Sequence, residues 1–343
     1  MHRSILRSPS AGLVIVLLAL GTLLTLVAGS HVDPVSGQSV NNFLNAHTLI
    51  QMATDASTFA IMGVGATLVI ISGAIDLSVG AVYALAGVAM AMVLRAAGPM
   101  NPVATVGLGL ATCLTVAFLC GLANGLMVVG LGVHSFIITL GTMWILRGLA
   151  FVASHAESIL VPAALTSVAK ASLGLGASLS PVPLLAMLAV TAVGAVFLNR
   201  TVMGRHVLAI GGNAEASRFS GLRVNRIRLG VFLISAVTAG VAAFLGASFY
   251  GSATSSDGTG YELYVIASAV VGGASLAGGK GSALSAMLGA LLIVLIRQAI
   301  RTLHLDQNYE WIIIGTAMIV AVVVDQKGSQ LLARKLTKQT LSS

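Results

Sequence analysis

Long apolar stretches recur along this chain of 343 residues and constrain its fold more than any other feature. A run of roughly 18 or more apolar residues is long enough to cross a hydrocarbon core of about 30 Å as a helix. The short alternating segments of a membrane β-barrel are absent from the sequence. It therefore predicts an all-α polytopic membrane protein with one domain, residues 1–343. The expected spans are 11–29, 52–73, 78–95, 103–128, 133–153, 181–198, 229–250, 262–277, 282–301 and 310–325.

The first apolar stretch has two interpretations. Arg3 and Arg7 precede it, as in a secretory signal peptide. The run from Ala11 to Gly29 is longer than the usual signal core, which favours a first membrane span. Cleavage would leave the later spans unchanged, so both interpretations stay open.

Lysine and arginine are distributed unevenly between the expected loops. With a cytoplasmic N-terminus, thirteen of them fall inside and three (Arg95, Lys170 and Arg301) fall outside. Cytoplasmic loops carry the excess of basic residues, so both termini and the tail at about 326–343 are expected in the cytoplasm. This asymmetry explains the net charge of +8 without a nucleic-acid partner.

One compact polar segment, GGNAEASRFSGLRVNRIR at 211–228, interrupts a chain that is only 8% charged. Asn213 is a favourable N-cap, Glu215 suits the first turn of a helix, and Gly221 can close its end in the left-handed conformation. These residues predict a short cytoplasmic helix from Ala214 to Ser220. An exposed Phe219 on it indicates a docking surface, whereas the alternative is a solvated basic loop that only sets orientation.

Recognisable catalytic motifs are missing from the sequence. The glycine-rich stretch at 272–282 differs from a phosphate-binding loop, because Ala274 replaces its first glycine and Gly281 follows the lysine in place of Ser or Thr. Cys113 and Cys120 lie within one apolar stretch and are interpreted as buried thiols. We therefore expect no enzyme activity, no metal site and no bound cofactor.

Several polar residues within or beside the spans have two interpretations each. Asp76 either lines a cavity at a break between spans or caps the next helix. Asn124 either lines a polar path or bonds between helices. Arg147 and Arg297 are costly at membrane depth, and structural pairing is the favoured explanation for both. The small residues Gly121 and Gly125, and also Ser285 and Gly289, are expected to allow close helix packing.

Four stretches together resemble the permease subunits of ribose-, xylose- and galactofuranose-type ABC importers. They are GAIDLSVGAVYALAG (73–87), SFIITLGTMWILRGLA (135–150), GRHVLAIGGNAEASRFSGLRVNRIR (204–228) and GTGYELYVIASAVVGGASLAGGKG (258–281). The resemblance implies a half-transporter of about ten spans in the bacterial inner membrane, surrounded by lipid. It also implies a second permease copy or paralogue, a cytoplasmic ATPase that binds ATP and Mg²⁺, and a periplasmic sugar-binding protein.

In such importers a short helix between spans inserts into a groove of the ATPase. The resemblance places this coupling helix at about 213–221, with Gly212, Asn213 and Gly221 at its ends and Ala216 and Ser217 within it. Glu215, Arg218 and Phe219 are then the expected ATPase contacts. The candidate pathway or gate residues are Asp76, Asn124, His134, Ser135, Phe136, Thr139 and Tyr264.

Three positions depart from the pattern of these permeases. Ala74 stands where a second glycine is common, His134 where proline or glutamine is common, and Tyr264 where aspartate often occurs. The sequence therefore indicates no particular sugar. The alternative functions are an ion-coupled transporter, for which Asp55 and Asp76 are the only interior carboxylates, and a membrane assembly protein without transport.

Overall fold

The protein is described by a computed structural model covering residues 9–32, 37–173 and 180–323. Among these residues, eight helices are long and apolar enough to cross a membrane. They are α1 (Pro9–Val27), α2 (Ala46–Ile71), α3 (Val79–Ala97), α4 (Pro102–Gly130), α5 (Ser135–Ser154), α7 (Val182–Arg200), α10 (Val224–Tyr250) and α12 (Ala283–Thr302).

Shorter elements connect or extend these helices. They are α6 (Ala163–Ala169), α8 (Val202–Gly212), α9 (Ala214–Phe219), α11 (Tyr261–Val271) and a last helix at Tyr309–Val323. Two small antiparallel sheets join β1 (Ser30–Val32) to β2 (Ser39–Asn41) and β3 (Ile159–Leu160) to β4 (Ser252–Ala253).

The helical, polytopic architecture confirms the sequence prediction, with two differences. The expected spans at 262–277 and 310–325 are shorter helices, Tyr261–Val271 and Tyr309–Val323. Glycine ends α11 early, because Gly273 adopts a positive φ of 93° that an α-helix cannot continue. The tail at 326–343 lies outside the described residues.

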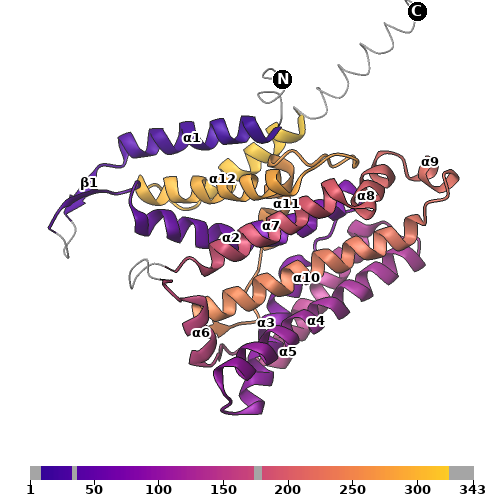
Figure 1. Cartoon of the computed structure of the whole chain (residues 1–343), viewed down its shortest axis with the longest axis horizontal. Helices are drawn as coiled ribbons and strands as arrows, with labels where there is room; N and C mark the ends of the chain where they lie inside the picture. Colours follow the sequence, from indigo (N-terminus) through magenta and orange to yellow (C-terminus); the bar gives the residue numbers. More distant parts are fainter. Residues whose placement is uncertain (1–8, 33–36, 174–179, 324–343) are drawn as a thin grey trace, which may run out of the picture.

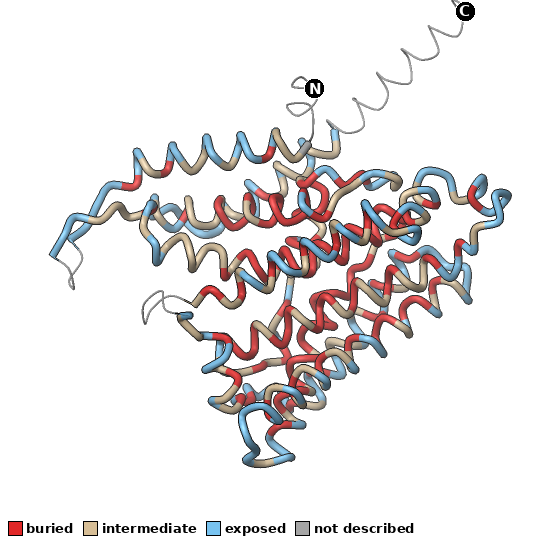
Figure 2. Tube along the Cα trace, in the orientation of Figure 1, coloured by how far each residue is buried: buried red, intermediate tan, exposed pale blue. Residues whose placement is uncertain are grey.

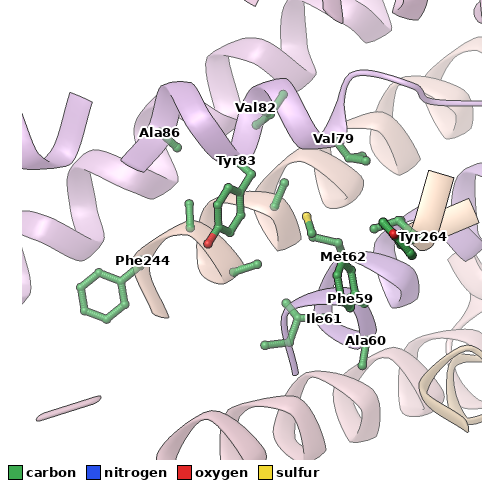
Figure 3. Close-up of a cluster of buried hydrophobic side chains, with 14 of the residues drawn as sticks. Phe59, Ala60, Ile61, Met62, Val79, Val82, Tyr83, Ala86, Phe244 and Tyr264 are labelled. Carbon is green, nitrogen blue, oxygen red and sulfur yellow. The ribbon is translucent and has the colours of Figure 1, made fainter. Parts of the chain in front are cut away.

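Helix α2 forms the centre of the molecule. Within it, 89% of the residues of an apolar stretch of 18 are buried, and α7, α10, α11 and α12 pack against it. Figure 2 shows the buried residues concentrated in these inner helices, while the outer face of α1 is largely exposed. Figure 3 shows Phe59 and Met62 of α2, Tyr83 of α3 and Phe244 of α10 within one buried apolar layer.

Small residues allow the inner helices to approach closely. A Cβ added to Gly121 would lie 2.7 Å from Cβ of Ala236, and one added to Gly125 would lie 2.5 Å from Cδ1 of Leu229. Gly289 is similarly close to the carbonyl of Ser268. The prediction that these glycines serve helix packing is confirmed for α4 against α10 and for α12 against α11.

Arg147 of α5 is paired structurally, as the sequence favoured. Its Nη1 donates to the backbone carbonyl of Ser255 at 2.7 Å and to that of Asp257. The guanidinium thus holds the connection between β4 and α11 against α5.

Candidate functional site

The polar segment at 211–228 contains the short helix expected from its capping residues. Oδ1 of Asn213 accepts a hydrogen bond from N of Ala216 at 2.9 Å. At the other end, Gly221 has φ 84°. Its N–H donates to the carbonyl of Arg218, and N of Leu222 donates to the carbonyl of Ser217 at 3.0 Å. These two bonds form a Schellman motif. The helix runs from Ala214 to Phe219, and Ser220 is its C-cap.

Helix α9 projects from one end of the bundle, opposite the end that carries β1 (Figure 1). The side chain of Phe219 is 86% exposed, and those of Glu215 and Arg218 are also exposed. Ser217 faces inward and is buried. Glu215, Arg218 and Phe219 are therefore accessible to another protein, on a backbone whose two ends are fixed by caps.

Helix α8, which leads directly into α9, touches two interruptions of the helical core. Gly211 lies so close to the carbonyl of Ile71 that a Cβ would overlap it. The same carbonyl accepts a hydrogen bond from N of Gly279 at 2.8 Å. The end of α8 thus contacts both the α2–α3 connection and the glycine-rich α11–α12 connection.

Asp76 lies in the α2–α3 connection and is buried in a network of polar side chains. Its Oδ1 accepts hydrogen bonds from N and Oγ of Ser78 at 2.9 and 2.7 Å, and its Oδ2 accepts from Oγ of Ser235 at 3.0 Å. Nδ2 of Asn124 donates to Oγ of Ser78 at 2.7 Å. The N-cap interpretation of Asp76 is wrong, because Ser78 is the N-cap residue of α3.

Two predicted pathway residues on α5 satisfy the backbone of the same connection. Oγ of Ser135 accepts from N of Ile75 at 3.0 Å, and Oγ1 of Thr139 accepts from N of Leu77 at 3.1 Å. Non-helical backbone inside a membrane protein needs such partners, since water and lipid do not supply them there. Asp76, Asn124, Ser135 and Thr139 therefore form one buried support for residues 74–78.

The remaining predicted pathway residues lie elsewhere. His134 is the N-cap residue of α5 and is exposed, and its Nδ1 accepts from N of Phe136 at 3.3 Å. Phe136 is exposed on the outer surface of α5. A cavity of about 510 Å³ opens beside His134 and Ser135 and reaches Arg218 and Arg228. Sequence reasoning missed Asn225 and Arg228 in this cavity, although both belong to the polar segment.

Tyr264 lies in a separate cluster among α2, α11, α12 and the last helix. Its hydroxyl donates to Oε1 of Glu310 at 2.7 Å, and Nε of Arg297 pairs with the same oxygen at 2.7 Å. The guanidinium lies 5.0 Å from the ring centroid of Tyr264 and 5.5 Å from that of Phe59. Arg297 is thus structurally paired, and it joins elements that are far apart in the sequence.

The other interior carboxylate, Asp55, is also paired. Its Oδ2 lies 3.3 Å from Nη1 of Arg301, and its Oδ1 accepts from Nε2 of Gln51 at 3.0 Å. Both interior carboxylates that the sequence offers to an ion-coupled transporter, Asp55 and Asp76, therefore have protein partners.

Comparison with known proteins identifies the family. Residues 48–322 match the model of the branched-chain amino acid transport system permease component. The chain is 36% identical over 285 residues to the ribose import permease protein of Haemophilus influenzae, covering 83% of this chain and 86% of that protein. It is 34% identical over 286 residues to the D-allose transport system permease protein of Escherichia coli, covering 83% and 85%.

A third relative, a probable ABC transporter permease protein of Sinorhizobium fredii, is 32% identical over 306 residues, which cover 89% of this chain and 86% of the relative. No solved structure matches the chain. The matches extend across the α2–α3 connection, α9 and the α11–α12 connection. The chain belongs to the family of branched-chain amino acid transport system permease components, as a translocation-pathway subunit of an ABC importer and not as an enzyme.

Proposed function

We propose that this permease imports a monosaccharide or a related small polar solute across the bacterial inner membrane. The observation that carries the proposal is similarity along more than four fifths of the chain to permeases named for ribose and D-allose. Relatives named for autoinducer 2 import, at 30–32% identity, widen the solute class beyond simple sugars. The solute reaches the permease from a periplasmic binding protein, and ATP and Mg²⁺ bind to a separate cytoplasmic ATPase.

The proposed topology has ten spans in one membrane domain and both termini in the cytoplasm. The excess of Lys and Arg at 199–228 supports a cytoplasmic position for α8 and α9. Helix α11 has 11 residues, which extend about 16 Å at 1.5 Å per residue. The α11–α12 connection completes this crossing within the protein, beside Ile71 and Gly211.

In the proposed mechanism, the ATPase closes on binding ATP, and α9 transmits this movement to the membrane domain. Glu215, Arg218 and Phe219 bind in a groove of the ATPase, so α9 moves together with the ATPase. Because α8 precedes α9 directly and packs against Ile71 and Gly279, the motion reaches both interruptions of the helical core. A second copy of the permease or a paralogue completes the pathway, and lipid surrounds the pair.

Substitution of Gly211 tests the contact between α8 and the Ile71 carbonyl, through which this movement is transmitted. Gly211→Ala should sharply reduce the amount of folded protein, because its Cβ would overlap the Ile71 carbonyl. Gly212→Ala is the matched control, since nothing lies within 4 Å of its Cβ. Size-exclusion chromatography of fluorescently tagged variants in detergent measures the folded amount. Equal amounts of both variants would contradict the close contact.

Cysteine labelling in intact cells tests the orientation. Cys113 and Cys120 are both buried and should react poorly, so introduced cysteines dominate the signal. Glu215→Cys should react with a membrane-permeant maleimide but not with an impermeant one. Ser256→Cys, at an exposed position of the β4–α11 connection, should react with both once the outer membrane is permeabilised. The reverse pattern would invert the proposed topology.

Purification of the tagged permease from its native membrane tests the assembly. The proposal predicts that an ATPase subunit co-purifies, and that the periplasmic binding protein associates when solute is present. A permease that carries neither partner would favour an assembly protein without transport.

A further inference from the structure

The cavity beside α9 has the features of a site for a small anion. It measures about 510 Å³ and lies where four segments meet. These segments are the α2–α3 connection, the α4–α5 turn, α9 and the start of α10. Its lining includes Gly73, Ala74, His134, Arg218, Asn225 and Arg228.

The charges in this cavity are all of one sign. Arg218 and Arg228 both line it, and no Asp or Glu of the described part of the chain does. Among the described residues, neither arginine forms an ion pair, and Nε of Arg228 is buried without a hydrogen-bond partner. Two guanidiniums that face one cavity repel each other, and a buried donor without a partner is costly. An anion between them would remove both penalties.

The shape and chemistry of the lining indicate which anion fits. Guanidinium groups bind phosphate through paired N–H donors, and two of them can hold one phosphate group. Ligand sites commonly measure about 300–1,000 Å³, so this cavity has room for more than a phosphate ion. Asn225 and His134 offer polar contacts to hydroxyl groups, beside apolar Val129 and Val133.

We propose that this cavity binds a phosphate monoester of a small hydroxylated solute from the cytoplasm. The inference rests on the proposed function and orientation. An imported sugar carries hydroxyl groups that a cytoplasmic kinase can phosphorylate, so a sugar phosphate would form on the side of the membrane where this cavity opens. A ligand here would bridge the α2–α3 connection, the α4–α5 turn, α9 and α10. It would hold α9 in place relative to the membrane domain and slow import when the phosphorylated product accumulates.

Binding is tested on the purified complex of permease and ATPase in lipid nanodiscs. Glucose 6-phosphate and ribose 5-phosphate are titrated by calorimetry, with inorganic phosphate, glucose and ribose as comparisons. We expect saturable binding of at least one sugar phosphate, weaker binding of inorganic phosphate and none of the free sugars at this site. Arg228→Gln should weaken binding about tenfold or more, since a charge-assisted pair is lost. Val133→Phe should also weaken binding by filling the cavity while both arginines remain.

Arg226→Gln is the matched control, because Arg226 lies two residues away on the same helix, is exposed and does not line the cavity. It should bind sugar phosphate as the unmodified complex does. Nanodiscs with and without phosphatidylglycerol distinguish a soluble phosphate ester from a lipid headgroup as the ligand. If phosphatidylglycerol occupies the cavity and soluble sugar phosphates do not bind, the site belongs to a lipid headgroup and the proposal is wrong. Binding to the permease alone but not to the complex would also overturn it, because the ATPase would then fill the cavity. Since binding is measured without transport, its failure leaves the import function untouched.

Discussion

Phe219→Ala is expected to lower ATP-driven uptake at least about tenfold, the loss typical when an aromatic residue at the centre of a protein interface is truncated. The side chain is 86% exposed, so its removal costs little folding energy. The helix itself should persist, because its caps at Asn213 and Gly221 do not involve Phe219. ATP hydrolysis by the assembled complex should then respond only weakly to solute-loaded binding protein.

Uptake into cells, normalised to the amount of permease in the membrane, measures this effect. Phe118→Ala is the control, since Phe118 is also exposed but lies on α4, away from α9. Arg218→Glu should also lower ATP-driven uptake, because it reverses the charge on the surface of α9 that contacts the ATPase. Normal uptake by both Phe219→Ala and Arg218→Glu would show that α9 is not the docking site.

Asp76 should be essential for folding through its hydrogen bonds and not through its charge. Asp76→Ala removes the acceptors of three buried donors, the N–H and hydroxyl of Ser78 and the hydroxyl of Ser235. Each buried donor left without a partner costs about 1–3 kcal/mol, so this variant should lose several kcal/mol of stability. We expect little folded protein in the membrane.

Asp76→Asn separates this structural role from ion coupling. The amide oxygen can still accept from Ser78, and the hydroxyl of Ser235 can rotate to accept from the new amide. The amount of folded protein and the rate of uptake should both remain within about threefold of the unmodified level. A threefold change corresponds to about 0.7 kcal/mol of free energy, since about 1.4 kcal/mol changes an equilibrium tenfold. An ion-coupled transporter would instead lose transport in Asp76→Asn while staying folded. Thermal stability in detergent and uptake by the same preparation distinguish the two outcomes.

Local sequence signals were sufficient to predict α9. Asn213 and Gly221 act on neighbouring backbone groups, so their roles do not depend on the rest of the fold. The packing role of Gly121 and Gly125 was likewise visible from their spacing, because residues four apart share one helix face. Hydrophobicity places most ends of the long helices to within about two residues, but α2 begins six residues and α10 five residues before the expected start.

Long-range contacts had no comparable local signal. Ser235 bonds to Asp76 across 159 residues, and it lies within an apolar stretch that gives no sign of this contact. Tyr264 bonds to Glu310 across 46 residues, so the sequence alone grouped Tyr264 with residues that it does not approach. The residues that line the cavity come from segments near 73, 130 and 225. Only the tertiary fold brings them together.

The shortness of α11 was also hidden in the sequence. The stretch at 262–277 is apolar enough for a span, but Gly272 and Gly273 stop the helix after Val271. A Cβ at Gly272 would meet the carbonyl of Ser285, so the chain passes α12 too closely for any other residue. The hydrophobicity of this stretch predicts that it lies in the membrane, but it does not predict where α11 ends.

Uptake by purified components shows whether ATP hydrolysis on a partner drives import through this chain. Permease and ATPase are reconstituted into liposomes with trapped ATP, and labelled solute is supplied on its binding protein. We expect uptake that vanadate abolishes and that a protonophore leaves unchanged. Uptake that persists with vanadate and collapses with the protonophore would contradict it.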